Sequence, residues 1–221
     1  MRRYILVGAG GFGREVMPLA RAQFRREIAA GEADIHFAVE DQHLPNLCET
    51  NGVPIISLRQ ACGLPGEIHF NVAIADSKIR ERIAAYCLAA GMAPFSIEAA
   101  STLDLAANQI GAGAVFCPFT IVTANVRIGR FFHANFYSYV GHDCEIGDFV
   151  TFGPSVRCNG NIRIEDHAYI ATGAMLHPGS RTSPLVIGQA AVVGIGAVVL
   201  SNVPAGATVF GNPARQFPKA A

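Results

Sequence analysis

A period of six residues runs through the second half of the chain. Counting in steps of six from Ile110 to Leu176, all twelve residues reached are apolar or small. Neither a helix nor a coiled coil has this period; it is the repeat of a parallel β-helix, in which each six-residue segment forms one side of a triangular coil. Glycine often follows the first residue of a segment, and the fifth residue is usually small or β-branched. This pattern is typical of the left-handed form and predicts such a β-helix over residues 96–221.

Residues eighteen apart in such a coil stack on one another at about the strand spacing, ~4.8 Å. The six-residue register breaks after Leu176 and resumes at Ile187, Val193, Val199 and Ala205. The step from 176 to 187 is eleven residues long, so five residues must leave the coil. We expect them to loop out at 181–185, where proline and polar residues gather.

The first 95 residues alternate between predicted strands and predicted helices. The strands are expected at 4–7, 35–39, 53–56 and 68–74, and the helices at 14–30 and 77–90. Such alternation favours a small parallel sheet flanked by helices, a Rossmann-like α/β domain. In the second helix we expect Ile79, Ile83 and Tyr86 to face the core, and Arg80 and Arg82 to face solvent. The sequence therefore predicts two domains, 1–95 and 96–221.

A glycine-rich loop follows the first predicted strand. Gly8, Gly10 and Gly13 fit the G-x-G-x-x-G pattern between a strand and a helix, and Gly11 lies within it. Glycines let the backbone approach a phosphate, and the helix N-terminus supplies N–H donors. The loop predicts a nucleotide site without identifying the nucleotide, and a simple tight turn remains an alternative.

An acidic pair, Glu40 and Asp41, ends the second predicted strand. Because the carboxyl ends of parallel strands meet at one edge of the sheet, this pair is placed to accept hydrogen bonds from a ribose or a base. A solvated acidic turn is the other interpretation of the same two residues.

Four histidines of the coil fall at positions that the register turns outward: His133, His142, His167 and His177. His142 stands out because Asp143 follows it and Gly160 lies one coil further on. A proton acceptor beside an accessible backbone N–H is what acyl transfer to an amine or hydroxyl needs. An ordinary surface histidine is the alternative that spacing alone leaves open.

Aromatic side chains also fall at outward positions. Phe131, Phe149 and His167 are eighteen apart and predict one stripe, while Phe119 and Tyr137 predict another. Exposed rings in stripes indicate a partner surface. A flat-sided prism most simply buries them against copies of itself, so we expect a closed threefold ring, a homotrimer.

Charge and cysteine content exclude several classes of protein. The chain has 17 basic and 17 acidic side chains, so it lacks the excess of positive charge that binding to nucleic acid or an anionic membrane would need. Six cysteines without a CxxC pair indicate reduced thiols in the cytoplasm. The N-terminal apolar run is too short for a signal peptide, and no stretch reaches the ~18 apolar residues of a membrane span.

Four segments together, 5–16, 141–144, 158–161 and 211–215, resemble the bacterial nucleotide-sugar acetyltransferases of the sialic-acid O-acetyltransferase type. The resemblance extends over essentially the whole chain. It implies a Rossmann-like domain for the nucleotide of a nucleotide sugar, a left-handed β-helix, a homotrimer, and acetyl-CoA bound as co-substrate between neighbouring β-helices. No metal is implied. The activity implied is acetyl transfer to an amine or hydroxyl of a sugar in bacterial surface-glycan biosynthesis.

The resemblance also implies roles for single residues: His142 as catalytic base, Asp143 as its acidic neighbour, Gly160 as a backbone contact to the acetyl group, Asn135 as a sugar contact, and Glu40 with Asp41 as contacts to the nucleotide base. Two positions depart from the family pattern. Phe12 stands where many members have histidine in the glycine-rich loop. Thr151 stands where members often have a second histidine near the thioester, so this residue can donate one hydrogen bond but cannot share proton transfer.

Three other functions are compatible with parts of the sequence. The glycine-rich loop also suits an NAD-dependent oxidoreductase, although such an enzyme has no evident use for a β-helix. A metal-dependent hydratase of the γ-carbonic anhydrase kind needs three converging imidazoles, and no second histidine follows four or five residues after His177. A non-catalytic, trimeric sugar-binding protein is the third alternative.

Overall fold

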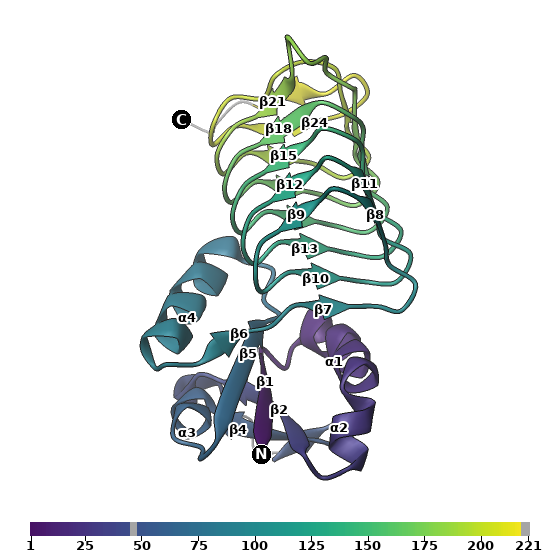
Figure 1. The fold of residues 1–221 in the computed structure, drawn as a ribbon. Helices are drawn as coiled ribbons and strands as arrows, with labels where there is room; N and C mark the ends of the chain where they lie inside the picture. The colour runs from purple at the N-terminus through teal and green to yellow at the C-terminus, as the bar shows by residue number, and fades with distance from the viewer. Residues whose placement is uncertain (45–47, 218–221) are drawn as a thin grey trace. The chain divides into compact units, whose positions relative to one another are not determined.

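The structure, a computed structural model, describes residues 1–44 and 48–217 and divides into two compact units, Met1–Glu98 and Ala99–Ala221 (Figure 1). We call them the front unit and the β-helix unit. Residues 218–221 of the predicted C-terminal tail lie outside the described residues. The described part of the chain has no helix that is both long enough and apolar enough to span a membrane.

The front unit is built on a mainly parallel sheet with the strand order β3-β4-β2-β1-β5-β6. Its strands are β1 (Arg2–Val7), β2 (Ala33–Val39), β3 (Glu49–Thr50), β4 (Val53–Ser57), β5 (Glu67–Val72) and β6 (Ala93–Pro94), followed by the short β7 (Ile97–Glu98). Among these described strands, β3 runs antiparallel to its neighbour, β4. The chain winds outward from β1 through β2 to β4 and then returns to the other side of β1 at β5. This reversal creates the kind of crevice at the carboxyl ends of the strands where α/β proteins bind ligands.

The helices of the front unit are α1 (Gly11–Gln23), α2 (Arg25–Ala29), the 3-10 helix η1 (Asp41–His43), α3 (Leu58–Cys62) and α4 (Ser77–Ala89). The prediction of a single helix over 14–30 is wrong in two respects: where the helix begins, and whether it is continuous. It begins earlier, at Gly11, and it is interrupted at Phe24, whose backbone leaves helical geometry. The ring of Phe24 stacks on Tyr4 of β1 with ring centroids 3.7 Å apart, which fixes this break against the sheet.

The buried face of α4 differs from the predicted one. Arg80, expected in solvent, is completely buried, while Ile79 and Tyr86 are exposed. The Arg80 guanidinium donates hydrogen bonds to the carbonyls of Ile74 and Ala75, at 2.6 and 3.2 Å. Helical periodicity alone misses this position because the carbonyls of a neighbouring loop, not apolar contacts, bring the side chain inside.

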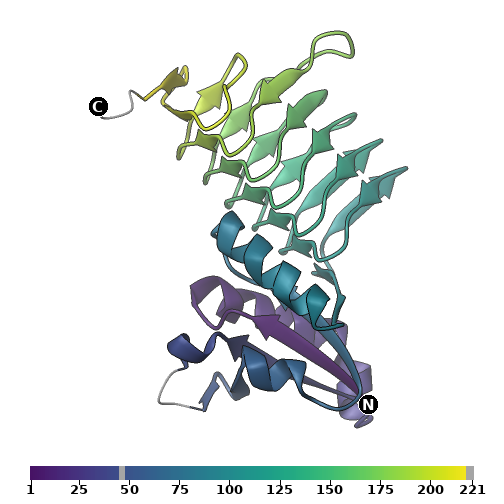
Figure 2. The ribbon, with the colours of Figure 1, turned by 90° about the vertical axis from the view of Figure 1, so that its left-hand side faces the viewer.

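The β-helix unit forms three sheets, which are the three sides of a left-handed coil (Figure 2). We name them face A (β10, β13, β16, β19, β22, β24), face B (β8, β11, β14, β17, β20, β23) and face C (β9, β12, β15, β18, β21). The short antiparallel β25 (Arg215–Gln216) pairs with β24. Successive coils pair in parallel with residues eighteen apart in register, such as Tyr139 with Arg157.

The bounds of these strands follow. Face A has β10 (Val115–Phe116), β13 (His133–Ala134), β16 (Thr151–Phe152), β19 (Tyr169–Ile170), β22 (Val192–Val193) and β24 (Thr208–Phe210). Face B has β8 (Leu103–Ala106), β11 (Ile121–Ala124), β14 (Tyr139–Val140), β17 (Arg157–Cys158), β20 (Met175–Leu176) and β23 (Val198–Val199). Face C has β9 (Gln109–Ile110), β12 (Arg127–Ile128), β15 (Glu145–Ile146), β18 (Ile162–Ile164) and β21 (Leu185–Ile187).

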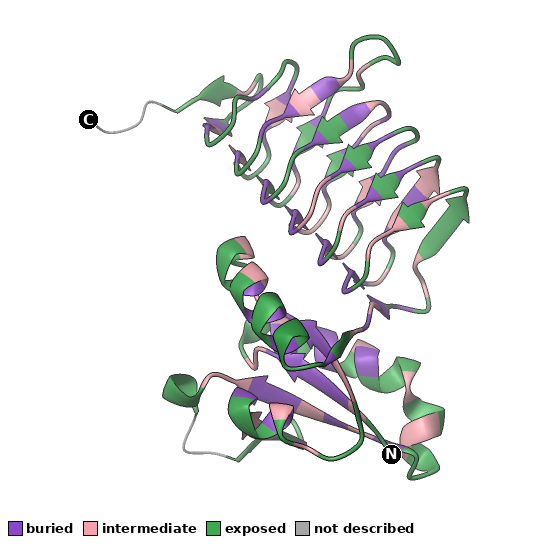
Figure 3. Cartoon of the chain, turned by 60° about the vertical axis from the view of Figure 1, so that its left-hand side comes forward, coloured by how far each residue is buried: buried purple, intermediate pink, exposed green. Residues whose placement is uncertain are grey.

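The core of the coil confirms the six-residue register. Every position of that register from Phe116 to Leu176 is buried in one continuous apolar cluster, and Ile110 packs against its end (Figure 3). Every sixth residue from Phe119 to His167 has a positive φ, between 53° and 63°, although none is glycine. These left-handed residues form the sharp corners between the faces.

The register ends sooner than predicted. Ala205 is exposed, and Val203 and Val209 are buried in its place. Val203 bridges to Ile187 only sixteen residues earlier, so the last coil is two residues shorter than the others. At the insertion, Leu185 belongs to β21 and pairs with Ile162, so the loop ends one residue before the predicted 181–185 segment does.

Two of the predicted outward histidines, His133 and His167, are buried, and so are the rings of the predicted stripe. Phe131, Phe149 and His167 stack face to face with centroids 5.4 Å apart, so each ring covers its neighbour within one chain. They therefore offer no wet surface to a partner, and that part of the oligomer prediction is wrong. By contrast, Phe119 and Tyr137 stack at 5.2 Å but remain 54% and 56% exposed.

Candidate active site

The corner between faces B and C carries the predicted histidine. His142 follows β14, and the backbone turns at Asp143, whose φ is +56°. This turn brings the two adjacent side chains together, and His142 Nδ1 lies 2.7 Å from Asp143 Oδ2. Both side chains are at least half exposed. The carboxylate thus fixes the orientation of an imidazole whose other nitrogen, Nε2, is left for chemistry.

Gly160 lies directly against this imidazole, one coil further on. A Cβ atom at Gly160 would come within 2.5 Å of His142 Nε2 and 2.6 Å of Cε1, so any residue other than glycine would displace the imidazole ring. In the part of the chain that the structure describes, the Gly160 N–H donates no hydrogen bond. At the corner between faces C and A the equivalent amides, of Arg130 and Asp148, are capped by aspartate side chains of the next coil. In the coil after Gly160 the corresponding residue is Pro178, whose side chain has no hydrogen-bond acceptor, so the Gly160 amide lacks such a cap and is left as a donor beside a base.

Asp143 is held as a carboxylate by its surroundings. The hydrogen bond with His142 is the main cause that lowers its pKa below the ordinary aspartate value, and Asn125 and the charge of Arg181 act in the same direction. Asn125 lies eighteen residues before Asp143, so it belongs to the same vertical stack. Asn125 was not predicted as a site residue, although the same eighteen-residue spacing would have found it.

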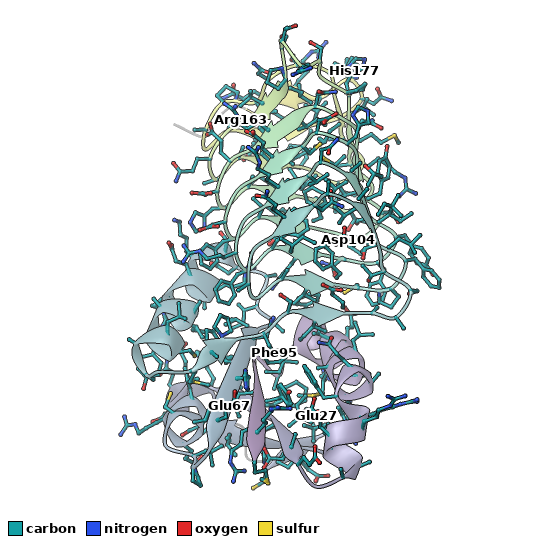
Figure 4. All side chains as sticks on the ribbon, viewed as in Figure 1. Glu27, Glu67, Phe95, Asp104, Arg163 and His177 are labelled. Atoms are coloured by element: carbon teal, nitrogen blue, oxygen red, sulfur yellow. The ribbon has the colours of Figure 1, made fainter. Side chains whose placement is uncertain are left out.

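A cavity of about 780 Å³ opens beside this pair. Asp143 and Glu145 line one part of it, together with Arg163 of face C and Arg181 of the inserted loop. Figure 4 shows Arg163 on the outside of the coil. Arg181 was not predicted as a site residue, because an insertion has no register from which its position can be read.

Thr151 and Asn135 are not brought to His142 within one chain. Thr151 belongs to β16 of face A and its side chain is almost fully buried, whereas His142 follows β14 of face B. Asn135 directly follows β13, also on face A, and its side-chain amide donates to the carbonyl of Phe152 at 2.8 Å. Their predicted contacts to the acetyl group and the sugar stay predictions.

The glycine-rich loop connects β1 to α1 at the carboxyl edge of the sheet. Gly8 has a φ of +108°, and a Cβ there would lie 2.9 Å from the Ala73 carbonyl oxygen. A Cβ at Gly13 would collide with the carbonyl oxygen of Gly8. At Gly10 and Gly11, however, an added Cβ would meet nothing within 4 Å. Packing therefore requires glycine at positions 8 and 13, whereas Gly10 and Gly11 leave open space at the N-terminus of α1.

The acidic pair lines a second cavity, of about 270 Å³, in the front unit. Glu40 accepts a bidentate pair of hydrogen bonds from Arg82 at 2.7 and 2.9 Å, and Asp41 lies 3.3 Å from Arg59. The hydrogen bonds from Arg82 lower the pKa of Glu40. The cavity therefore presents both acceptors and donors, a polar set that suits a nucleobase or a ribose, and its two arginines were not predicted.

Arg80 supports the same edge from inside. Its two hydrogen bonds hold the loop after β5, and that loop contacts Gly8. Burial lowers the pKa of Arg80 to about 9, so the guanidinium remains charged at neutral pH. Among the described residues, no group of three or more histidine, cysteine or acidic side chains is arranged to hold a metal ion.

Comparison with known proteins relates the chain to one domain family and to several acetyltransferases. Residues 3–87 match the family described as the PglD N-terminal domain. Over 218 residues the chain is 42% identical to GDP-perosamine N-acetyltransferase of Escherichia coli O157:H7, and the match covers 98% of this chain and 97% of that protein.

Two solved structures share the whole architecture. WeeI from Acinetobacter baumannii AYE superposes with a TM-score of 0.91 at 45% identity, over 98% of this chain and 100% of that one. The acetyltransferase domain of PglB from Neisseria gonorrhoeae FA1090, solved in complex with acetyl coenzyme A, superposes with a TM-score of 0.80 at 26% identity, over 97% and 98% of the two chains.

Proposed function

The chain belongs to the bacterial nucleotide-sugar acetyltransferases, and we propose that it transfers an acetyl group from acetyl-CoA to an amine of a nucleotide-linked sugar. The main support for this proposal is the position of the His142 imidazole, which is hydrogen-bonded to Asp143 and packs directly against Gly160. An amine acceptor and a GDP-linked sugar are favoured by the name of the Escherichia coli relative. The oxidoreductase and the non-catalytic trimer considered above fall outside this family.

The geometry supports direct transfer. His142 Nε2 accepts a proton from the amine while the amine nitrogen attacks the thioester carbonyl, and the Gly160 N–H donates to the carbonyl oxygen as it gains charge. When the carbon–sulfur bond breaks, the imidazolium returns its proton to the leaving thiolate. Asp143 stabilises the imidazolium between these two steps. No further residue need enter the proton balance, so the threonine at 151 is compatible with the reaction.

The acceptor is tested by a panel of nucleotide sugars with acetyl-CoA and a thiol-detecting reagent. We expect thiol release with a GDP-linked amino-sugar and little with its hydroxyl counterpart. UDP-linked amino-sugars test the nucleotide. If only hydroxyl sugars release thiol, the enzyme is an O-acetyltransferase, and the choice of an amine is wrong.

The front unit supplies the nucleotide site of the proposal, through Gly8, Gly10, Gly11, Gly13, Glu40 and Asp41. Both acetyl-CoA and activated sugars are cytoplasmic compounds, which agrees with the expected reduced cysteines. The proposed role is in the synthesis of a bacterial surface glycan, in the cytoplasm.

Gly10→Val should raise KM for the nucleotide sugar about tenfold or more and leave KM for acetyl-CoA unchanged. The backbone of Gly10 is extended and nothing surrounds its Cβ position, so the variant should fold normally and obstruct only a bound phosphate. Steady-state kinetics with each substrate varied in turn measures both constants. Equal changes in the two constants would show that the loop does not hold the nucleotide.

We further propose a homotrimer whose coenzyme site lies between neighbouring β-helices. The rings of Phe119 and Tyr137, stacked next to face B, are exposed to solvent in a single chain and offer an apolar surface that a second copy could bury. A neighbouring copy would also bring its own face A, with the half-buried Asn135, toward a ligand bound at His142. A three-sided prism suits a closed threefold arrangement.

Tyr137→Glu should dissociate the oligomer and lower activity with it, because a carboxylate in a dry interface costs several kcal/mol. The ring is half exposed in one chain, so the fold itself should survive. Light scattering measures the mass, and Tyr137→Phe, which keeps the ring, should remain oligomeric. A wild-type monomer at micromolar concentration, or a fully active dissociated variant, would refute the shared site.

A further inference from the structure

The inserted loop of the β-helix is a closed turn with an arginine at its tip. Ser180 and Ser183 exchange backbone hydrogen bonds of 2.9 and 3.1 Å, and the Ser183 amide also donates to Ser180 Oγ. Arg181 and Thr182 lie between them in the sequence. The guanidinium is therefore presented by a turn whose ends are fastened, which lowers the entropy cost of holding it in one place.

The base of this loop is hydrogen-bonded to the coil that lies against the His142 imidazole. The Gly179 amide donates to the Gly160 carbonyl at 3.1 Å, and the Leu185 amide donates to the Asn161 carbonyl at 3.3 Å. Both acceptors belong to the coil directly beside His142. Hydrogen bonds at both ends of the insertion, from Gly179 and Leu185, therefore fix it beside the proposed reaction centre.

The loop closes one side of the 780 Å³ cavity beside Asp143, and two arginines enter that cavity. Arg163 Nε lies 3.2 Å from Glu145, but Arg127 approaches the other oxygen of the same carboxylate at 3.5 Å. Within the described residues, Arg181 makes no ion pair or hydrogen bond of its own, although Asp143 senses its charge. The two carboxylates of the cavity, Asp143 and Glu145, therefore leave some N–H donors of its two arginines without a hydrogen-bond acceptor.

We propose that Arg181, assisted by Arg163, binds the diphosphate of a substrate and so places the reacting group at His142. The proposal rests on the acetyl transfer proposed above, in which both the coenzyme and the nucleotide sugar carry a diphosphate. A guanidinium matches phosphate oxygens with a planar fork of donors. Asp143, whose carboxylate lies 2.7 Å from the His142 imidazole, lines the same cavity as the two arginines, so the anion site adjoins the catalytic base.

The test compares Arg181→Ala with Arg127→Ala, a charge-matched control on face C that does not line this cavity. Arg181→Ala should raise the KM of one substrate about tenfold to a hundredfold and change kcat only a few-fold, since a hydrogen bond to a charged group contributes about 1.5–3 kcal/mol. Arg181→Lys should fall between. Arg127→Ala should match the wild type.

Two arms identify which diphosphate is bound. If it belongs to the coenzyme, KM for acetyl-CoA rises, and S-acetylpantetheine, which lacks the diphosphate, serves wild type and Arg181→Ala equally. If it belongs to the nucleotide sugar, KM for that substrate rises and the KM for acetyl-CoA stays constant.

Two results would overturn the proposal: both KM values within twofold of wild type, or a fall in kcat with both KM values unchanged, which would assign Arg181 to the Asp143 carboxylate alone. Calorimetric titration with CoA and with the nucleotide sugar separates this failure from a failure of the proposed reaction. Weaker binding of either compound to Arg181→Ala supports the diphosphate site even if no acetyl transfer is observed.

Discussion

Replacing His142 with alanine is expected to lower kcat by about 10²–10⁴ while leaving acetyl-CoA binding nearly intact. In the proposed reaction the imidazole accepts the proton of the attacking amine, and Asp143 Oδ2 lies 2.7 Å from its other nitrogen, Nδ1. The side chain is 60% exposed, so its removal should cost little stability.

The measurement is steady-state thiol release, with calorimetry for acetyl-CoA and a thermal unfolding curve as controls. A His142→Ala enzyme that works within a few-fold of the wild type would remove this residue from the mechanism. A loss of coenzyme binding equal to the loss of kcat would assign it to binding instead.

Gly160→Ala is expected to lower kcat by about 10² or more although it adds one methyl group. That methyl would lie 2.5 Å from His142 Nε2, so the imidazole must leave the position that Asp143 sets. The amide of residue 160 would also be screened from a bound carbonyl. The loss should appear in kcat, because the ring and the amide act on the reacting atoms.

A double-mutant cycle checks the physical cause. In the His142→Ala background the ring is gone, so adding Gly160→Ala should bring little further loss and no further destabilisation. If the two effects simply add, the glycine acts independently of the imidazole. If Gly160→Ala alone is nearly as active as wild type, the close contact has no catalytic consequence.

The arrangement of the β-helix could be predicted in detail because its periods are arithmetic. A six-residue register identifies the inward positions, and the eighteen-residue repeat by itself places His142 against Gly160. The family, the fold and the acetyltransferase activity predicted from the sequence are confirmed. The contact between His142 and Asp143 needed one further fact, the sharp turn at a non-glycine residue.

The same register could not predict exposure. Phe131 and Tyr137 both occupy corner positions with positive φ, yet one is 1% and the other 56% exposed. Phe131 stacks on Phe149 and Tyr137 stacks on Phe119, so register and ring stacking are the same for both, and exposure depends on the other segments that pack around each ring. This is why the stripe of Phe131, Phe149 and His167 was predicted as a partner surface and is instead an internal stack.

Apart from Asn125, the site residues that were not predicted from the sequence are arginines. Arg80 is buried by loop carbonyls, Arg82 pairs with Glu40 across 42 positions, and Arg181 lies on an insertion. Each depends on a contact between segments that share no period. A charged side chain on a polar helix face or a loop tip has no local signal that distinguishes such a role from solvation.

The most direct test of His142-assisted acetyl transfer is to identify the product after wild type and His142→Ala are each incubated with acetyl-CoA and a GDP-linked amino-sugar. Mass spectrometry and NMR would locate the added group. We expect one acetyl group in amide linkage on the sugar amine, formed rapidly by the wild type and at least about 10² times more slowly by His142→Ala. An acetyl ester on a hydroxyl, coenzyme hydrolysis without transfer, or equal product from the two proteins would contradict this mechanism.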